Sequence, residues 1–460
     1  MGNRISAPAG WYDRPHPDPL RREGRSGDGA IHARRHPQRR AAGCTGDARE
    51  DADAVAARLR ARPRIAAGRC ASRLRSLGAC RTSRVVIDDL LVVGGGIIGL
   101  SIADALVREG MAVRVLDSDR VASGASGAAA GMLAPLAEAL VHSDSDPSLN
   151  PFLRLGLESL SRFESLAHRL RDETGIDPEF ERSGLWRPVV DDDAQREALA
   201  GLARLGAAGD GIEWCQGEDL QEALPGLSEA IPGAFHSPLE CHVRPPLLAR
   251  GLAASLRSRG AVIEEGVSAM RVLREGDRVV GLETSAGLRR AGRVVVAAGA
   301  WTPALLEPVV ATAEVPAIAP VRGQILSLSA PLPAVRGIVY ARDVYCVPKR
   351  DGSWIVGATE ERVGFDRRVT AEGVALLLER ARALFPALES ASFDRAWAGL
   401  RPVEATGWPR VGATGLEDLF VAAGHGRNGV LLAPITAERL RDVITGKRPR
   451  TSDALLDSSG

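Results

Sequence analysis

The chain lacks several features, each of which would define a class of protein. No segment approaches the roughly 18 consecutive apolar residues of a membrane-spanning helix, so no membrane association is expected. The six cysteines include no Cys-x-x-Cys pair, and none stands at a convincing zinc-ligand spacing from a histidine. We therefore expect neither a metal site nor a disulfide framework, but the reduced thiols of a cytoplasmic protein.

The chain also has almost no net charge, because 59 basic and 58 acidic residues nearly cancel. Its overall charge therefore predicts neither a nucleic-acid nor a membrane partner. The balance conceals residues 1–84, which are rich in arginine, contain no lysine and show almost no apolar periodicity before residue 55. We expect a disordered extension here, which a wrong choice of start site would also explain. A basic arm for nucleic acid and a targeting peptide remain alternatives, although no apolar segment follows Arg21-Arg22 or Arg34-Arg35.

The most informative segment lies between residues 88 and 135. An apolar run leads into Gly94-x-Gly96-x-x-Gly99, followed by a helical pattern and a second apolar run that ends at Asp117. Gly94 allows a sharp turn, Gly96 lets backbone N–H groups approach a pyrophosphate, and Gly99 lets the helix pack tightly on the sheet. The helix N-terminus attracts phosphate, and a carboxylate about 20 residues further on suits a ribose hydroxyl. The segment therefore predicts a dinucleotide-binding strand, turn, helix and strand.

The sequence shows no catalytic Lys, His or Cys arrangement typical of an NAD dehydrogenase. Three other segments favour FAD as the dinucleotide. Small residues at 123–132 would let the backbone lie close to a flat ligand, although a tightly packed helix is an alternative. A buried strand at 294–297 ends near Gly299. Residues 421–434 predict a strand, a Gly-rich turn and a helix whose N-terminus would stabilise reduced flavin. A plain strand-to-helix turn is the alternative there.

The order of these patterns predicts an α/β fold. It consists of a discontinuous, Rossmann-like FAD-binding domain and an inserted substrate domain built on an antiparallel sheet. We assign residues 85–170, 240–310 and 395–460 to the FAD-binding domain and residues 171–239 and 311–394 to the substrate domain. Apolar spacing predicts helices over residues 151–170, 193–205, 245–259, 370–385 and 430–444. Strands are predicted over residues 261–264, in a hairpin of 269–273 with 278–284, and in an antiparallel sheet across 321–358.

Motifs spread over residues 88–445 carry a family resemblance. In order they read VVGGGIIG, SGAAAGMLAP, HVRPPLL, VVVAAGAW, VRGQILSL, YCVPKRDG, VGAT, WAGLRP and AAGHGRNGVLLAP. On these motifs the chain resembles the D-amino-acid oxidase superfamily of FAD-dependent amine oxidases, and within it the glycine oxidases of thiamine biosynthesis. The resemblance implies a small amino-acid substrate, O2 as oxidant and a homotetramer. No cysteine lies in the flavin motifs, so we expect the FAD to be bound without a covalent bond.

The implied reaction transfers a hydride from the substrate Cα to flavin N5, hydrolyses the imine to glyoxylate and reduces O2 to H2O2. The cofactor supplies the difficult chemistry, which fits the absence of a Ser/His/Asp arrangement. Sarcosine and small D-amino acids are alternative substrates. Two departures from the family pattern bear on that choice, since Gly426 stands where a bulkier residue is expected and Asp343 where a histidine can occur.

By the same resemblance, Arg401 matches the arginine that binds the substrate carboxylate, a role suited to its two-pronged guanidinium. Tyr345 matches a tyrosine whose hydroxyl reaches that carboxylate, and Arg427 matches an arginine near the flavin and the mouth of the active site, so we expect these three residues to form the catalytic site. A surface ion pair and a packed core tyrosine are the alternatives for Arg401 and Tyr345. Besides Gly94, Gly96, Gly99 and Asp117, the expected cofactor positions are Ile97, Ile98, Ser118, Ala125, Ser126, Ala130, Gly131, Met132, Val272, Gly299, His425, Gly426, Arg427, Asn428, Gly429, Val430 and Leu431.

Three other functions stay open on the sequence. A D-amino-acid dehydrogenase would pass its electrons to a membrane quinone and produce little H2O2. A flavoprotein that removes an amine from a tRNA base would use residues 1–84 as its nucleic-acid arm, with salt-dependent binding. A binding protein without turnover would leave Arg401 and Tyr345 without a task.

Overall fold

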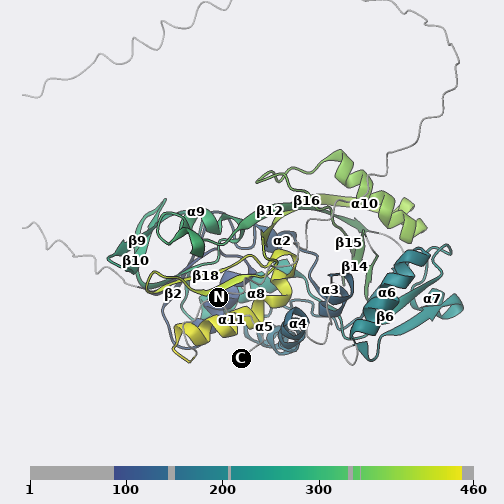
Figure 1. Cartoon of the computed structure of the whole chain (residues 1–460), viewed down its shortest axis with the longest axis horizontal. Helices are drawn as coiled ribbons and strands as arrows, with labels where there is room; N and C mark the ends of the chain where they lie inside the picture. The colour runs from purple at the N-terminus through teal and green to yellow at the C-terminus, as the bar shows by residue number, and fades with distance from the viewer. Residues whose placement is uncertain (1–87, 143–150, 206–208, 330–334, 342, 448–460) are drawn as a thin grey trace, which may run out of the picture. The chain divides into compact units, whose positions relative to one another are not determined.

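The computed structural model describes residues 88–142, 151–205, 209–329, 335–341 and 343–447. The extension predicted over residues 1–84 lies outside them. Two large sheets organise the described chain, which confirms the predicted α/β class (Figure 1). None of the helices in these ranges is long and apolar enough to cross a membrane.

The first sheet is mainly parallel, in the order β17-β18-β11-β1-β2-β8. Its central strand β1 is buried except at Asp89, as expected for a strand covered on both faces. The parallel strand predicted at 294–297 is confirmed as the end of β11, which pairs with β1 and β18. The first half of β11 pairs instead with β10 of the predicted hairpin, and β10 in turn pairs with β9. The bounds are β1 Asp88–Val93, β2 Val113–Asp117, β8 Val262–Glu265, β9 Ala269–Glu275, β10 Arg278–Thr284, β11 Gly287–Val296, β17 Arg410–Ala413 and β18 Leu419–Ala423.

Both faces of this sheet are covered, one by helices and the other mainly by a hairpin. On one face α1, α8 and α11 share a core that includes Leu100, Leu252 and Leu440. On the other face the β9–β10 hairpin and the short α9 pack through Val272, Leu282 and other apolar residues. The bounds are α1 Ile97–Val107, α8 Pro245–Ser258, α9 Thr302–Leu306 and α11 Gly429–Ile444.

The single helix predicted over residues 151–170 is wrong, because the chain forms two helices there. These are α4 Pro151–Leu160 and α5 Phe163–Thr174. α4 lies beside α11, whereas α5 packs against α8 (Figure 1). The chain therefore breaks where it passes from one packing partner to the other, and Arg162 at the break is fixed by an ion pair with Glu438 of 2.6 Å.

The second sheet has the order β16-β12-β15-β14-β13-β4-β6-β5. Its neighbours are antiparallel, as predicted across 321–358, except that β13 runs parallel to β4. The sequence analysis missed β16, an edge strand in which Pro402 is tolerated. The bounds are β4 Leu185–Val189, β5 Glu213–Gln216, β6 Gly233–Ser237, β12 Ile318–Ser329, β13 Ile338–Tyr340, β14 Tyr345–Pro348, β15 Ser353–Gly357 and β16 Ser392–Glu404.

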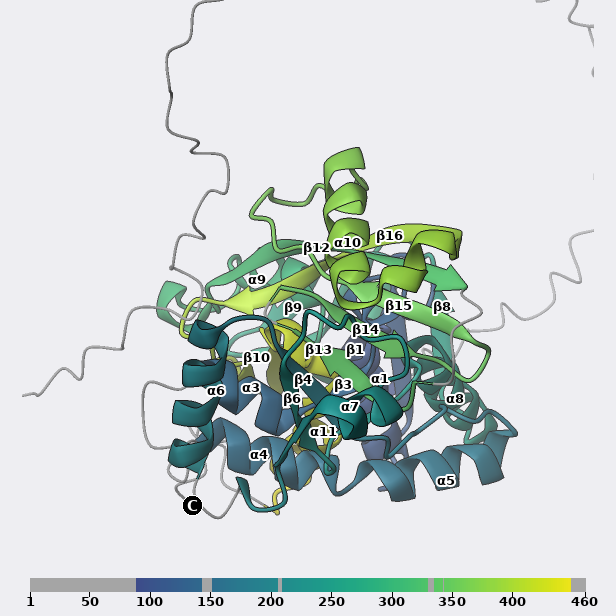
Figure 2. The ribbon, with the colours of Figure 1, turned by 90° about the vertical axis from the view of Figure 1, so that its right-hand side faces the viewer.

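The two faces of the second sheet have different neighbours. α10 lies over β12 and β15 on one face (Figure 2), where Leu377 joins Leu326 and Val356 in an apolar core. The opposite face carries Ile325 and Val347, and packs against Ala130 and other residues of the segment that follows β2. The remaining helices and strands are α2 Ala125–Ala128, β3 Met132–Leu133, α3 Pro135–His142, α6 Asp192–Leu205, α7 Gly217–Ala223, β7 Cys241–His242 and α10 Ala371–Leu384.

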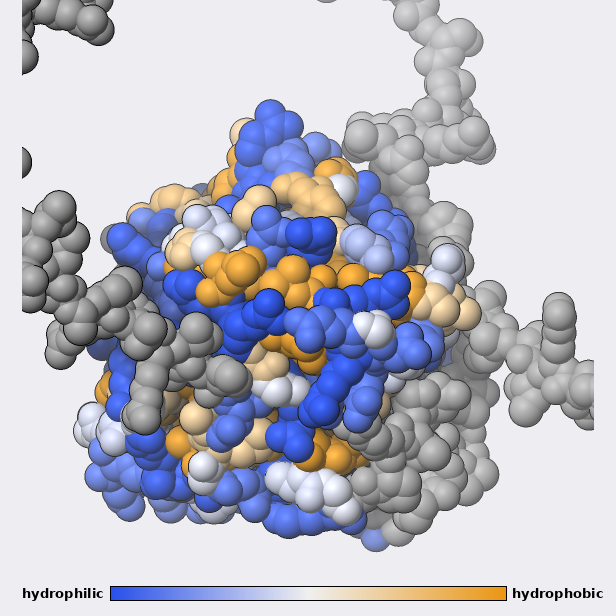
Figure 3. Space-filling model, turned by 90° about the vertical axis from the view of Figure 1, so that its left-hand side faces the viewer, coloured by the Kyte–Doolittle hydropathy of each residue, from blue (hydrophilic) through white to orange (hydrophobic). Residues whose placement is uncertain are grey.

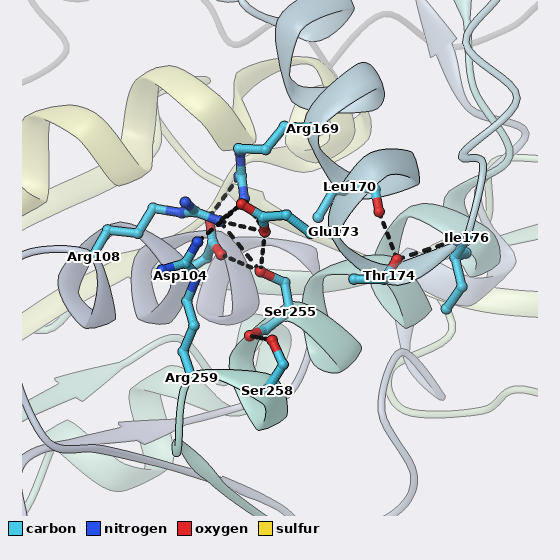
Figure 4. Close-up of polar contacts among 10 residues, drawn as sticks. All are labelled: Asp104, Arg108, Arg169, Leu170, Glu173, Thr174, Ile176, Ser255, Ser258 and Arg259. Atoms are coloured by element: carbon cyan, nitrogen blue, oxygen red, sulfur yellow. Dashed lines mark hydrogen bonds and ion pairs between the residues drawn. The ribbon is translucent and has the colours of Figure 1, made fainter.

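A polar network joins α1, α5 and α8 beside the first sheet (Figure 4). Glu173 accepts hydrogen bonds from Arg108 at 2.7 Å, Ser255 at 2.8 Å and Arg259 at 2.9 Å. Partial burial disfavours its charged form, but these hydrogen bonds outweigh burial and lower the pKa of Glu173 to about 2. The ionised carboxylate therefore holds the three helices together.

Glu173→Gln is expected to lower the free energy of unfolding by about 1–3 kcal/mol at pH 7. Because the folded-state pKa is depressed, this contribution is present above the unfolded pKa and is lost as the pH falls from about 5 towards 2. Urea denaturation should therefore separate the variant from the original protein at pH 7 and much less at pH 3. The exposed Glu229→Gln serves as the control, and an equal difference at both pH values would rule out this role of the charge.

Candidate active site

Close backbone contacts explain the glycines of the first turn. Gly94 has a φ of +109°, and a Cβ there would overlap the carbonyl of Ala297, the residue that follows the neighbouring strand β11. A Cβ on Gly99 would overlap the carbonyl of Gly94 and lie 3.2 Å from Cγ1 of Val92. These contacts give a physical reason for glycine at both positions, as the spacing predicted.

The turn gathers two of the predicted cofactor residues from other segments. The backbone N–H of Gly95 donates to Oδ2 of Asp117 at 2.7 Å, and that of Ile97 donates to Oγ of Ser126 at 2.9 Å. Asp117 is half-buried at the end of β2, whereas Ser118 is exposed. The structure thus brings Asp117 and Ser126 to the N-terminus of α1.

The N-termini of α1 and α11 have the chemistry that an FAD site requires. The N-cap residue of α1 is Gly96, which has no side chain, and the side chain of Asn428 at the N-cap of α11 does not bond the first turn. Neither first turn contains an acidic residue. Both ends therefore present partial positive charge, which suits the diphosphate at α1 and the negative edge of reduced flavin at α11. Gly299 adds open space, because a Cβ built there would meet no atom within 4 Å. These residues fit FAD.

The small residues at 123–132 serve tight packing as well as close approach. A Cβ on Gly127 would overlap the carbonyl of Ala122, and one on Gly131, where φ is +86°, would overlap that of Val243. Lys349 fixes the same loop by donating from Nζ to the carbonyls of Ala130 and Val243, each at 2.9 Å. Burial lowers the pKa of Lys349 to about 7. Lys349 was not among the residues predicted from the sequence, although it lies within the YCVPKRDG motif.

One row of residues crosses the face of the second sheet that packs against Ala130. Strand register places Trp397 opposite Ile325, Ile325 opposite Gly357, Gly357 opposite Tyr345, and Tyr345 opposite Tyr340. Directly paired residues share a face, so all of these point towards the segment expected to hold the cofactor. Trp397 is therefore a half-buried part of this face.

Arg401 and Tyr345 form the part of the site suited to a carboxylate. Nη1 of Arg401 donates to the carbonyl of Thr359 at 3.0 Å, and among the described residues no carboxylate forms an ion pair with Arg401. Burial raises the pKa of Tyr345 to about 12, against the opposing effect of the Arg401 charge. The phenol therefore stays protonated at neutral pH and can donate a hydrogen bond.

Tyr340 and Glu138 were missed by the sequence analysis. The rings of Tyr340 and Tyr345 meet edge to face, with centroids 6.3 Å apart, and burial raises the pKa of Tyr340 as well. Nε of Arg427 donates to Oε2 of the buried Glu138 at 3.0 Å. Arg427 is thus neutralised by a carboxylate of α3.

The other predicted positions lie in different settings. His425 is buried with Nε2 3.1 Å from Oγ1 of Thr436, and burial lowers its pKa to about 3, so it is neutral. Gly426 has a φ of +55°, in the left-handed region that favours glycine. Val272 lies in β9 with its side chain in the apolar core, and Asp343 is exposed. The remaining positions lie in α1 (Ile98), in or next to α2 and β3 (Ala125, Met132) and around the start of α11 (Asn428, Gly429, Val430 and Leu431).

Comparisons with known proteins show the family of the chain. The DAO family, described as FAD dependent oxidoreductase, matches residues 89–443. The glycine oxidase of Geobacillus kaustophilus is 34% identical over 362 residues, which are 78% of this chain and 93% of that protein. The bifunctional protein ThiO/ThiG of Nostoc sp. is 34% identical over 373 residues, and there the match spans 80% of this chain but only 54% of the relative.

Solved structures show the same fold. A crystal structure of glycine oxidase from Bacillus cereus superposes with a TM-score of 0.74 at 32% identity, covering 80% of this chain and 99% of that one. The L-proline dehydrogenase of P. horikoshii gives a TM-score of 0.69 at 21% identity, covering 79% of this chain and 95% of that one. At that identity the second likeness concerns the fold alone.

Proposed function

Because the chain belongs to the DAO family of FAD-dependent oxidoreductases, we propose that it oxidises glycine to glyoxylate and ammonia, with O2 reduced to H2O2. The observation that carries the proposal is Arg401, a guanidinium without an ion-paired carboxylate among the described residues, on the sheet face that bears Tyr345. The similarity to glycine oxidases over most of the chain supports the choice of substrate. In the balanced reaction, glycine, water and O2 give glyoxylate, ammonia and H2O2.

Arg401 and Tyr345 would bind and orient the substrate. Arg401 offers its remaining N–H donors to the carboxylate oxygens, and the protonated phenol of Tyr345 adds a further donor. Two anchors on one carboxylate fix which side of the amino acid faces the cofactor. We assign Arg427 a different task, because its pairing with Glu138 leaves it less able to take a carboxylate and places it as a wall of the site.

FAD, when bound, accepts the two electrons of amine oxidation. We propose that it is held without a covalent bond by the predicted cofactor positions, with its diphosphate at the N-terminus of α1 and its flavin near that of α11. The helix ends without acidic first turns support this placement. We further propose that the two sheets mark the FAD-binding and substrate domains, with one boundary moved from residue 395 to the end of β16, because residues 395–404 pair with β12 in the second sheet.

We place the enzyme in the cytoplasm, in thiamine thiazole synthesis, and similarity to a ThiO/ThiG protein supports that pathway. A homotetramer is proposed by family resemblance. An apolar band among hydrophilic residues on one face of the molecule is consistent with contact between subunits (Figure 3). Exposed large apolar residues of the described chain include Met270, Leu288 and Trp301.

The proposal is tested by incubating the purified holoenzyme in air with glycine, sarcosine, D-alanine and iminodiacetate in separate assays. Glycine should yield glyoxylate and H2O2 in equal amounts, with a higher kcat/KM than the other amines. Glycine turnover that needs an artificial electron acceptor would indicate a dehydrogenase. Turnover of another amine without turnover of glycine would exclude glycine as the substrate.

A further inference from the structure

The two groups assigned to the substrate carboxylate each lie over a glycine of the sheet. A Cβ built on Gly323 would stand 2.5 Å from both Nη1 and Nη2 of Arg401 and 2.6 Å from its Cζ. A Cβ built on Gly357 would overlap the hydroxyl of Tyr345 and stand 2.5 Å from its Cζ. In both cases the three nearest atoms belong to the functional end of a single side chain.

We propose that Gly323 and Gly357 are positioning residues that let the guanidinium of Arg401 and the phenol of Tyr345 lie flat on the sheet. The inference rests on the proposed function, because it takes these two groups as the carboxylate clamp. It adds two residues that contact no substrate themselves and act only through their neighbours.

Strand register shows why glycine is needed at the first position. Gly323 on β12 pairs with Gly399 on β16, and Arg401 lies two residues further along β16 on the same face. Strand side chains ordinarily stand upright on a sheet. Arg401 instead leans across Gly323 to reach the carbonyl of Thr359 at 3.0 Å. Any side chain on Gly323 would occupy that path.

The same register explains the second glycine. Gly357 on β15 pairs directly with Tyr345 on β14, and the phenol folds over it. Neither Gly323 nor Gly357 has a positive φ, so the backbone conformation does not demand glycine at these positions. The demand comes from the side chain that lies above each of them.

The consequence of an added methyl group differs from that of most core clashes. At Gly323 the nearest atoms are the far end of a flexible side chain, so the sheet can accept alanine by displacing the guanidinium. The fold and the FAD content should survive while the substrate contact is lost. Gly323→Ala is therefore expected to raise KM for glycine by about 10- to 100-fold with a smaller change in kcat.

A double-mutant cycle separates positioning from a general structural effect. The expected result is that Gly323→Ala has less than about a twofold effect in an Arg401→Ala background, because the group it displaces is already gone. Gly357→Ala should behave in the same way in a Tyr345→Ala background, which removes the whole ring that a Cβ on Gly357 would displace. Gly292→Ala on β11 is the matched control, since a Cβ there would make an ordinary 3.6 Å contact with the carbonyl of Asp89.

A second readout keeps the inference separate from the choice of substrate. Acetate carries the carboxylate but no amine, and its dissociation constant can be followed by the change that it causes in flavin absorbance. If wild type fails to oxidise glycine, yet Gly323→Ala weakens acetate binding only when Arg401 is present, the proposed substrate fails and the positioning role stands. An unchanged KM and acetate affinity in Gly323→Ala, or equal losses in both backgrounds, would overturn the inference.

Discussion

Arg401→Ala is expected to raise KM for glycine by about 30- to 1,000-fold while the protein keeps its bound FAD. The estimate follows from the loss of charge-assisted hydrogen bonds to a carboxylate, worth about 2–4 kcal/mol in total. The Arg401 guanidinium is bonded to the carbonyl of Thr359, and no carboxylate among the described residues competes for it. Steady-state kinetics with glycine, together with the ratio of flavin to protein, measure both parts of this expectation.

The matched control is Arg395→Ala on the same strand. The Arg395 guanidinium is exposed and lies 4.5 Å from the centre of the Trp397 ring. It should change KM by less than about threefold, since single exposed side chains contribute little. A KM for glycine that is the same in Arg401→Ala and in wild type would remove Arg401 from the substrate site.

Gly99→Val is expected to yield a protein with little or no bound FAD. Even a single Cβ at this position overlaps the carbonyl of Gly94, and valine adds two methyl groups close to Val92. The first turn of α1 must then move away from β1, which removes the backbone N–H groups from the diphosphate. The ratio of visible flavin absorbance to protein absorbance after purification measures the loss.

Ala105→Val tests whether β-branching in this helix is itself the cause. Ala105 lies in α1 and is only partly buried, so its substitution carries the helix-propensity cost without the backbone overlap. We expect near-normal flavin content in this variant. Full FAD occupancy in Gly99→Val would contradict the assignment of the first turn to the diphosphate.

The parts of the molecule that the sequence predicted well carry their signal locally. The apolar run of β1 and the glycines Gly94 and Gly99 encode a turn whose close contacts the structure shows directly. The hairpin of β9 with β10 likewise follows from alternation and a short turn within one segment. Elements of this kind can be predicted because residues close together in the sequence determine them.

Elements fixed by distant contacts were predicted less well. β16 is the clearest case, because its residues Trp397, Gly399 and Arg401 show no simple alternation of apolar and polar types. Its extended form comes from pairing with β12 along almost its whole length. The break between α4 and α5 has a similar origin, in two different packing partners.

The site residues that were not predicted also include one with a local signal and one without. Tyr340 stands five residues before Tyr345, and treating the GIVYARDVY segment as two paired strands would have placed the two rings together. No local pattern could have identified Glu138, because 289 residues separate it in the chain from its partner Arg427. Only the folded structure brings such a pair together.

An anaerobic titration with glycine shows whether this protein is an oxidase that acts on glycine. The holoenzyme is titrated with glycine in the absence of O2 while the visible flavin band is recorded, and air is then admitted with detection of H2O2. We expect glycine to bleach the band and air to restore it with formation of one H2O2 per flavin. An FAD-loaded protein whose visible band glycine does not bleach, or a bleached protein that produces no H2O2 in air, would show that the protein is not a glycine oxidase.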